Sequence, residues 1–464
     1  MLSLVKRNGV KWFDRLAVAL LAISLLVGAG LVSASSQTDK SIGRLKKIKH
    51  VIVVYQENWS FDSLYGDFPG ANGLDNAGSA VVQIDKLGVP YPVLPQPVDI
   101  VSPNRFPANL PVQPFDASLY VPADQTTADL VHRFYQEQYQ IDGGKMDRFV
   151  AGSNAAGLVM SYYNATNLPE GKLAQKYTLA DNFFHAAFGG SFLNHFWLIC
   201  ACTPTFNNAP TSAVAVLDAN GNLVQDGFVT PDGYAVNTAF TVNNPHPANV
   251  PAANLVPLQT QPTIGDRLSA KDISWAWYSG GWNDALAGKP DPLFQFHHQP
   301  FAYFANYADG TQAKTKHLKD ITDFFKALKN ERLPAVSFIK PLGPDNEHPG
   351  YANLIKGQQY VADLVSAVQA SDYWEDTVIL ITYDENGGRW DHVAPPAGDR
   401  WGPGSRVPLI IISPYAKRGF VDHTQYDTTS ILKFIETRWN LAPLGTRDAA
   451  ATNLLNAFDF TKDH

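Results

Sequence analysis

The chain has 464 residues, of which 45% are hydrophobic and 17% are charged. This length and composition exclude a disordered protein and provide enough apolar surface for a large buried core. The formal net charge is −7, and no long basic run occurs beyond the N-terminus. We therefore expect no nucleic acid or anionic membrane as a partner, and the composition favours a small ligand.

Residues 1–34 have the layout of a secretory signal peptide. Four basic residues precede an apolar run over 16–32, and small residues follow at 33–36. This pattern predicts cleavage before Ser35 and export to the periplasm or the medium. A run of about 17 apolar residues is near the lower limit for spanning a bilayer, so a retained anchor is the alternative.

Short β-branched runs and helical patterns alternate along the rest of the chain. The first run, His50–Gln56, reads HVIVVYQ and is typical of a strand buried on both faces. Similar runs occur at 335–339, 378–383 and 407–413, and helical patterns occur at 321–328, 357–370 and 429–439. The alternation predicts an α/β fold in which helices sandwich a mostly parallel central sheet.

Two stretches have little periodicity. Residues near 82–122 and 206–262 are irregular, and the second stretch is rich in Asn, Ala, Pro and Val. We interpret both as inserted loops or small β-additions, so that residues 35–464 form a single domain.

The chain contains two cysteines, Cys200 and Cys202. One intervening residue makes a disulfide between them geometrically awkward. We therefore expect the core, and not disulfides, to stabilise the fold.

Polar side chains directly follow two of the predicted strands. Glu57 and Asn58 follow the first, and Asp384 and Glu385 follow the run at 378–383. Carboxyl ends of parallel strands meet at one sheet edge, where ligands of such sheets bind. Clustered carboxylates favour a divalent cation. Helix capping and loop polarity are the alternative.

A glycine pair precedes a serine in the segment GGSFLNH at 189–195. Glycines permit a tight turn and a close approach of the backbone to an anion. A metal-bound Ser191 hydroxyl would be activated to attack an electrophile, commonly phosphorus. Most such segments are only turns, so this motif alone is weak evidence.

Histidines elsewhere could bind phosphoryl oxygens or protonate a leaving group. The candidates are His132, which precedes Lys145 and Asp147, one member of the pair 297–298, His348 and His392.

Four segments together carry a resemblance. They are HVIVVYQENWSFDSLYG at 50–66, GGSFLNH at 189–195, NEHPG at 346–350 and YDENGGRWDHVAPP at 383–396. In sequence and order they resemble the phosphoesterase family of bacterial acid phosphatases and phosphatidylcholine-hydrolysing phospholipases C, a branch of the alkaline phosphatase superfamily. The resemblance implies one divalent metal ion, of unknown identity, at the carboxyl edge of the sheet.

The resemblance also implies roles for individual residues. Ser191 matches the nucleophile, and His298 and His348 match catalytic positions that contact the phosphoryl group. The implied metal ligands are Glu57, Asn58, Ser191, Asp384 and Glu385. The implied substrate-binding residues are Asn58, His132, Lys145, Asp147, Asn194 and His392.

Three functions are compatible with these residues. The phospholipase C members usually have a threonine followed by a Pro-Asn-Arg stretch at the nucleophile, whereas this chain has SFLNH. We therefore predict an exported, metal-dependent acid phosphatase that hydrolyses phosphomonoesters through a phosphoserine intermediate. The alternatives are a phospholipase C acting on phosphatidylcholine-type lipids and a non-catalytic exported phosphoester-binding protein.

The partner predicted for the acid phosphatase is a small phosphorylated substrate, with no nucleic acid and no stable membrane association after signal cleavage. The oligomeric state stays open. A phospholipase C would in addition need an apolar approach surface. The aromatic segments 275–282 and 294–304 could provide one, although aromatic residues are more often core.

Overall fold

The computed structural model describes residues 43–100 and 105–461. The predicted signal peptide lies outside these residues. From Ile48 onwards the chain forms one compact unit. None of the helices in the described part of the chain has the length and apolar character that a membrane span requires.

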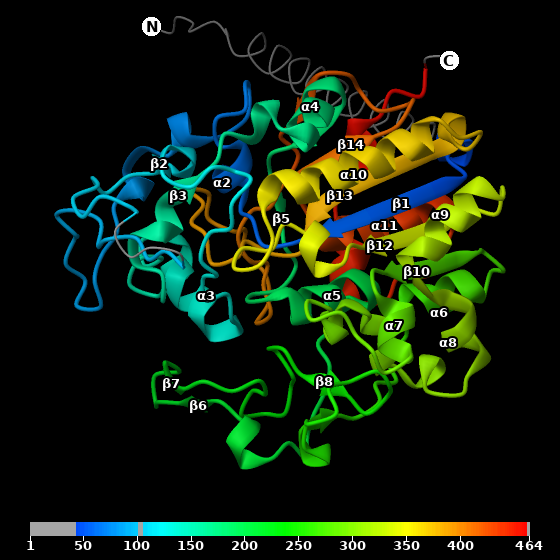
Figure 1. Cartoon of the computed structure of the whole chain (residues 1–464), viewed down its shortest axis with the longest axis horizontal. Helices are drawn as coiled ribbons and strands as arrows, with labels where there is room; N and C mark the ends of the chain where they lie inside the picture. The colour runs from blue at the N-terminus through cyan, green and yellow to red at the C-terminus, as the bar shows by residue number, and fades with distance from the viewer. Residues whose placement is uncertain (1–42, 101–104, 462–464) are drawn as a thin grey trace, which may run out of the picture. The chain divides into compact units, whose positions relative to one another are not determined.

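An eight-stranded sheet forms the centre of the described residues, in the order β11-β10-β12-β1-β13-β14-β4-β15 (Figure 1). The bounds in chain order are β1 His50–Gln56, β4 Thr178–Ala180, β10 Trp275–Ser279, β11 Leu318–Asp320, β12 Val336–Lys340, β13 Thr377–Tyr383, β14 Leu409–Ile412 and β15 Phe420–Asp422.

The middle of the sheet is parallel. Val51 of β1 is in register with Val336 of β12 on one side and with Val378 of β13 on the other. Strand β14 runs antiparallel to both β13 and β4. All of β13 is buried, which explains its continuous apolar run. The predicted α/β fold with a mostly parallel sheet is confirmed. The reversed direction of β14 could not be predicted, because an apolar run carries no signal of strand orientation.

Helices lie on both faces of this sheet (Figure 1). Helix α10 (Leu354–Gln369) lies across one face, and its predicted stripe of Val361, Leu364, Val365 and Val368 is buried. Helix α11 (Thr428–Trp439) lies on the other face. The remaining helices are α2 Phe61–Tyr65, α3 Phe134–Ile141, α4 Pro169–Lys176, α5 Ser191–Cys200, α6 Ile264–Ser269, α7 Trp282–Leu286, α8 Gln312–His317, α9 Ile321–Lys329 and α12 Thr446–Ala450.

The short strands of the described residues form four separate two-stranded sheets outside the central one. The stretch 206–262 contains the hairpin of β6 (Val216–Leu217) and β7 (Leu223–Gln225) and the pair of β8 (Phe240–Thr241) and β9 (Leu255–Val256). The described residues of 82–122 mostly lack regular secondary structure. The other short strands are β2 Phe115–Asp116, β3 Ser161–Tyr162, β5 Phe183–Phe184 and β16 Tyr426–Asp427.

The structure contradicts the argument that a disulfide between Cys200 and Cys202 is geometrically awkward. Cys200 and Cys202 form a disulfide with their Cα atoms 5.1 Å apart. Helix α5 ends at Cys200, and Ala201 adopts the left-handed conformation with φ 46°. This conformation reverses the chain, so that two cysteines separated by one residue reach the Cα separation that a disulfide needs.

The aromatic segments do not form an exposed approach surface. Trp275 and Trp277 lie in β10, which is buried throughout. In the second segment, Phe294, Phe301 and Phe304 are buried as well. These side chains belong to the core, so any apolar surface near the site must come from another part of the chain.

Candidate functional site

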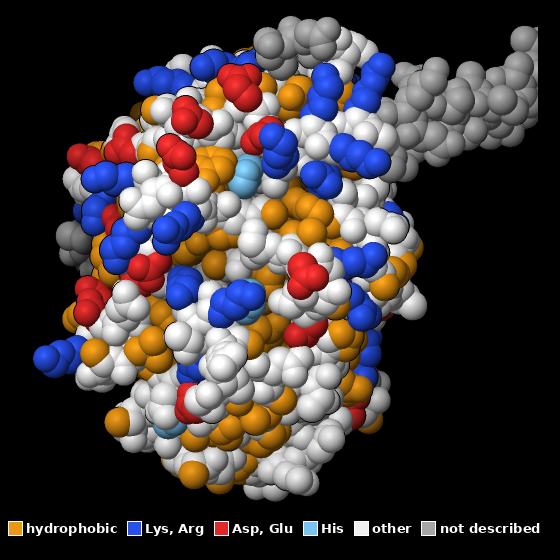
Figure 2. All heavy atoms as spheres, turned by 90° about the vertical axis from the view of Figure 1, so that its right-hand side faces the viewer, with side chains coloured by type: hydrophobic (Ala, Val, Ile, Leu, Met, Phe, Trp, Pro, Cys, Tyr) orange, Lys and Arg blue, Asp and Glu red, His pale blue; other side chains and the backbone are white. Residues whose placement is uncertain are grey.

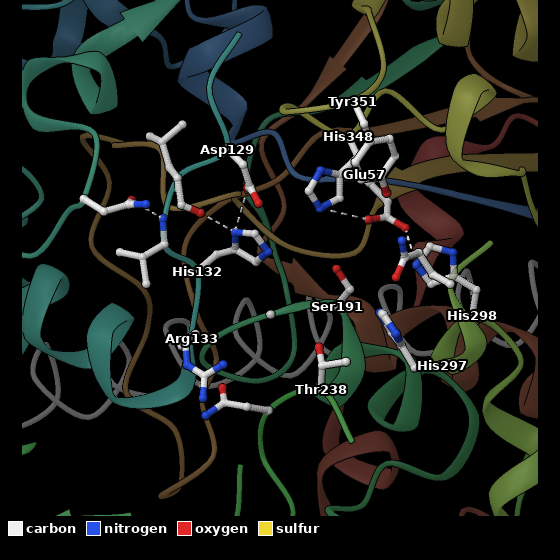
Figure 3. Close-up of a pocket in the computed structure, with 16 residues that line it drawn as sticks. Glu57, Asp129, His132, Arg133, Ser191, Thr238, His297, His298, His348 and Tyr351 are labelled. Atoms are coloured by element: carbon white, nitrogen blue, oxygen red, sulfur yellow. Dashed lines mark hydrogen bonds and ion pairs between the residues drawn. The ribbon is translucent and has the colours of Figure 1, made fainter. Parts of the chain in front are cut away.

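A cavity of about 400 Å³ lies where the carboxyl end of β1 meets the start of α5. In Figure 3, Ser191 points into its centre, with His132 on one side and Glu57 with His298 on the other. The lining residues are Glu57, Asp129, Leu130, Val131, His132, Arg133, Asn154, Gly190, Ser191, Asn237, Thr238, Gln295, His297, His298, His348 and Tyr351.

Ser191 is the first residue of α5, and both preceding glycines are required by close packing. Gly189 has φ 87°, and a Cβ atom there would lie 2.4 Å from the backbone nitrogen of Phe134. A Cβ atom on Gly190 would lie 2.7 Å from the carbonyl oxygen of His132. The Ser191 hydroxyl donates to Asn58 Oδ1 at 3.4 Å. The positive end of the α5 dipole also favours negative charge at this oxygen.

Glu57 lies in the wall of the cavity, directly after β1, and is 1% exposed. Its Oε1 lies 2.5 Å from His298 Nε2 and 2.9 Å from Lys340 Nζ. Its Oε2 lies 3.7 Å from His348 Nε2. Burial opposes ionisation, but His298 and Lys340 hold the pKa of Glu57 well below its usual value. Glu57 is therefore a charged carboxylate.

Asp384 and Glu385 follow β13, the neighbour of β1. Asp384 Oδ2 lies 3.2 Å from Lys340 Nζ, and Glu385 Oε2 accepts from the Gly387 amide. Burial raises the pKa of Asp384 to about 6. Burial and the neighbouring Asp384 raise the pKa of Glu385 well above its usual value. Among the described residues, the single ammonium of Lys340 therefore does not balance the carboxyl groups of Glu57, Asp384 and Glu385.

The donor set fits a divalent cation. Asp384 Oδ1 and Glu385 Oε1 are buried and accept no hydrogen bond from the described residues. Leaving such oxygens unpaired is costly, and a cation bound by carboxylate, amide and hydroxyl oxygens removes that cost. Glu57, Asn58, Ser191, Asp384 and Glu385 could hold it. Several divalent ions accept these ligands, so the donor set does not select one.

Within the described residues, two groups bring three potential ligand atoms to within 4.8 Å of one another, and neither contains Glu57, Asp384 or Glu385. Asp129, His132 and His348 lie at the same cavity, and Asp62, Asp391 and His392 form the second group. The Arg406 guanidinium pairs with Asp62 and with Asp391 at 2.9 and 2.8 Å. Because this guanidinium already neutralises the two aspartates, we interpret the second group as a structural ion-pair network.

Lys340 was not among the residues predicted for the site. It is the last residue of β12 and is fully buried, and its ammonium lies between Glu57 and Asp384. The sequence contains a signal for Lys340, because this residue ends an apolar strand, and Glu57 and Asp384 lie at the ends of apolar strands as well. A lysine at a strand end is usually solvent-exposed, so the pattern alone does not indicate a buried site residue.

Lys340→Met should lower the unfolding free energy of the metal-free protein by about 3–5 kcal/mol, because it leaves two buried carboxylates without their cation. Added divalent metal should recover part of this loss. Chemical denaturation with and without metal measures both effects. Lys356→Met is the matched control, since Lys356 is half exposed and pairs with Asp345, and it should cost less than about 1 kcal/mol. Equal losses in the two variants would contradict the assignment.

Three histidines predicted for the site line the cavity. The ring Nδ1 of His132 donates to the Leu130 carbonyl, and that of His348 donates to the Pro349 carbonyl. In the neutral rings these bonds leave Nε2 as an acceptor, and His132 Nε2 accepts from the Asn58 side-chain amide at 3.4 Å. His132 Nε2 lies 3.7 Å from Glu385 Oε1. For His298, burial lowers the pKa to about 4.

Other predicted residues lie outside the cavity lining. Lys145 pairs with Asp142 on the surface. The pKa of Asp147 is raised by burial and by Asp142. His392 contacts Asp62 and Asn72. These residues share motifs with the site, but their side chains point elsewhere.

The sequence predicts that Asn194 binds the substrate, but its side chain is not part of the cavity lining. Its amide donates to the carbonyls of Ala187 and Gly189, and its Oδ1 accepts from the Ala187 amide. It therefore fixes the loop that leads to Ser191. His195, one residue further, donates from Nδ1 to the Ser191 carbonyl and stacks on His298 with ring centroids 5.2 Å apart.

A second layer of buried polar groups supports the site. Glu347 accepts from Gln56 at 2.9 Å and from the Tyr383 hydroxyl at 2.8 Å. Gln56, Tyr383 and Glu347 are the chain neighbours of Glu57, Asp384 and His348. The same Tyr383 hydroxyl contacts Glu170 at 3.1 Å. Burial raises the pKa of Glu347 to about 7 and that of Glu170 well above its usual value. The two carboxyl groups therefore hold a proton at neutral pH.

Glu347→Gln should flatten the dependence of stability on pH. The folded protein keeps the Glu347 proton up to a pKa of about 7, whereas the unfolded chain releases it near 4.5. The stabilisation by this proton is complete below 4.5 and is lost as the pH rises towards and beyond 7, on the order of 3 kcal/mol. Unfolding free energies at pH 4.5 and 8 measure it, with the exposed Glu375→Gln as control. An unchanged profile in Glu347→Gln would contradict the shared proton.

The structure brings a serine and buried carboxylates to the carboxyl edge of a mostly parallel α/β sheet. The chain belongs to the Phosphoesterase family, whose model matches residues 48–442. This confirms the resemblance that the sequence motifs carried.

Several proteins that are similar to this chain are named phospholipases C. The chain is 25% identical to the non-hemolytic phospholipase C of Pseudomonas aeruginosa, over 99% of this chain and 64% of that protein. It is 28% identical to the non-hemolytic phospholipase C of Burkholderia pseudomallei, over 91% and 60%. The chain thus spans less than two thirds of the length of these two relatives. Phospholipase C B of Mycobacterium tuberculosis is 24% identical over 97% of this chain and 85% of its own.

Solved structures resemble the chain more distantly. A protein of the alkaline phosphatase superfamily from Vibrio parahaemolyticus matches with a TM-score of 0.34 and 10% identity, over 81% of this chain and 77% of its own. The lipoteichoic acid synthase LtaP from Listeria monocytogenes matches with a TM-score of 0.34 and 8% identity, over 89% and 81%.

The comparisons bear on the choice between the predicted functions. They support hydrolysis of phosphoester bonds and do not specifically support an acid phosphatase. The names of the relatives fit the phospholipase C alternative better.

Proposed function

We propose that the protein is an exported, metal-dependent phospholipase C that cleaves phosphatidylcholine-type phospholipids. The observation that carries the proposal is the arrangement of Ser191 at the start of α5, facing Glu57, His298 and His348 across one cavity. The names of the relatives support the phospholipid as substrate. Export rests on the signal-peptide pattern of residues 1–34.

A bound divalent cation would lower the pKa of the Ser191 hydroxyl and withdraw charge from the phosphoryl group. Ser191 Oγ gives up its proton to water and attacks phosphorus, a new O–P bond forms, and the bond from phosphorus to the diacylglycerol oxygen breaks. Asn58, which accepts from the Ser191 hydroxyl at 3.4 Å, orients the nucleophile. Water then releases phosphocholine and restores the serine.

The histidines of the cavity stabilise the negative charge that develops on the phosphoryl and leaving-group oxygens during this reaction. His298 Nε2, beside Glu57, donates to a phosphoryl oxygen in the transition state. His348 Nε2 faces the same carboxylate, and we assign the imidazolium form of His348 to protonate the leaving diacylglycerol oxygen and the neutral form to take a proton back from the attacking water.

Hydrolysis of phosphomonoesters is the second candidate. It is favoured by the segment SFLNH at 191–195, which departs from the pattern typical of the phospholipase C members. A non-catalytic binding protein is disfavoured, because the nucleophile and all the carboxylates of the site are present.

The deciding experiment compares hydrolysis of a soluble phosphomonoester, a soluble phosphodiester and phosphatidylcholine by the purified protein, with and without chelator. The proposal predicts chelator-sensitive release of phosphocholine and diacylglycerol. Cleavage of the monoester alone would replace it by the phosphatase, and inactivity on all three would favour the binding protein.

A further inference from the structure

The catalytic cavity contains a second set of potential metal ligands, which the proposed reaction does not use as a set. Asp129, His132 and His348 each offer one ligand atom, and these atoms lie within 4.8 Å of one another. Figure 3 shows the Asp129 carboxylate between the two imidazole rings. The three residues share no member with the carboxylate, amide and hydroxyl donors described above for the first cation, so they form a separate candidate site.

Close packing brings together the two segments that carry these ligands. Gly350 has φ 94°, and a Cβ atom there would lie 2.8 Å from the Cβ atom of Asp129. The Gly350 amide donates to the Thr127 carbonyl at 2.8 Å. The glycine therefore allows the loop of Asp129 and His132 to lie directly against the segment that carries His348.

Both histidines have the orientation of metal-binding imidazoles. The Nδ1 atom of His132 donates to the Leu130 carbonyl, and that of His348 donates to the Pro349 carbonyl. In metal sites, a backbone carbonyl commonly binds one ring nitrogen of a histidine and fixes the tautomer in which the other nitrogen holds a free lone pair. Each Nε2 atom can therefore bind a cation without a change of ring orientation.

The third ligand completes a donor set that favours zinc. The side chain of Asp129 is 53% exposed, and its Oδ1 lies 3.6 Å from His132 Nδ1, so this carboxylate can turn towards both Nε2 atoms without disturbing the core. The contact of the Asn58 amide with His132 Nε2, at 3.4 Å, is a long hydrogen bond that a cation displaces at little cost. Two imidazole nitrogens and one carboxylate oxygen suit Zn²⁺, whereas oxygen donors alone suit Mg²⁺ or Ca²⁺.

Other parts of the described chain offer a weaker case. The group of Asp62, Asp391 and His392 also has three ligand atoms within reach of one another, but Arg406 pairs with both aspartates. On the face drawn in Figure 2, the visible His side chains lie apart from one another, and acidic side chains are interspersed with Lys and Arg. Asp129, by contrast, has a histidine as its ion-pair partner.

We propose that Asp129, His132 and His348 form a reversible, inhibitory Zn²⁺ site in the wall of the catalytic cavity. Zinc bound to His348 Nε2 displaces the proton of the imidazolium into water. His348 then has no proton to give to the leaving oxygen. The inhibition rests on the proposed function, because that function assigns His348 as the proton donor, whereas zinc binding rests on the ligand geometry alone.

Calorimetric titration with zinc chloride tests the binding. Excess Mg²⁺ is present to compete for the oxygen donors of the first site, because it binds imidazole poorly. Asp129→Ala should raise the dissociation constant of one zinc site by about tenfold or more. His392→Gln, which alters the other group, should leave the zinc dissociation constants within about twofold. Unchanged zinc binding in Asp129→Ala, or an equal loss in His392→Gln, would overturn the proposed site.

Hydrolysis of a soluble phosphodiester and of short-chain phosphatidylcholine tests the inhibition, with each protein compared with its own rate in the absence of zinc. The zinc concentration that halves the rate should be about tenfold or more higher in Asp129→Ala than in wild type, and should stay within about twofold in His392→Gln. Zinc that binds at this site without slowing wild-type hydrolysis would refute the inhibition. A wild-type protein that binds zinc there but cleaves neither substrate would refute the phospholipase, and with it the inhibition, and would support the zinc site.

Discussion

Ser191→Ala should lower turnover by at least about a thousandfold, which corresponds to about 4 kcal/mol in the barrier. The hydroxyl is the group that forms the bond to phosphorus in the proposed reaction, and no other described hydroxyl occupies the start of α5. The metal content should stay nearly unchanged, because the three buried carboxylates Glu57, Asp384 and Glu385 remain. Initial rates and elemental analysis of the same preparation measure the two quantities.

Thr238→Ala is the matched control for this variant. Thr238 lines the same cavity but has no part in bond formation, so its loss should change the rate by less than about tenfold. A Ser191→Ala protein within tenfold of wild type would remove Ser191 from the reaction. A Ser191→Ala protein without metal would assign the serine to metal binding, so that its loss of activity could not be attributed to a missing nucleophile.

Asp384→Asn should abolish both metal binding and activity. The substitution keeps the size of the side chain but removes the charge of a ligand that contacts Lys340 and has one oxygen without a partner. Chelator should inactivate the wild-type protein by about a hundredfold or more, and divalent metal should restore the wild type but not the variant.

His392→Gln is the control for the metal prediction. His392 belongs to the group with Asp62 and Asp391, so metal bound there would be weakened by this change. We expect the metal content of His392→Gln to equal that of wild type. The opposite result, with metal lost in His392→Gln and retained in Asp384→Asn, would move the metal centre to the Arg406 network.

Two of the predicted site residues that the structure brings together share one property: each directly follows a strand that the apolar pattern identifies. Glu57 follows β1, Asp384 follows β13, and Ser191 begins a helix after two glycines. The carboxyl edge of a parallel sheet then brings them together without any further information. The same rule places Lys340, the last residue of β12, at this edge.

Residues that depend on irregular backbone could not be placed in this way. Thr238 and Asn237 come from an insertion without periodicity, so no pattern directs them to the cavity. His392 lies in a site motif, but Asp62 and Asn72 bind its ring elsewhere. The disulfide depends on the left-handed Ala201, and an alanine gives no signal of that conformation.

The exposure of Leu87, which is 87% exposed, is likewise a property of a turn whose geometry is set by Asp85. Sequence alone shows apolar residues in irregular segments and does not distinguish a small local core from projecting tips. The structure makes this distinction, because the Asp85 carboxylate closes its turn and leaves the Leu87 side chain outside.

The most direct test of the account is to quench the wild-type protein during turnover of short-chain phosphatidylcholine and to map its peptides by mass spectrometry. We predict one phosphocholine group attached to Ser191, because the serine forms the bond to phosphorus and diacylglycerol leaves. Product formation without any adduct at Ser191 under conditions that slow its hydrolysis, or an adduct on another residue, would contradict the account.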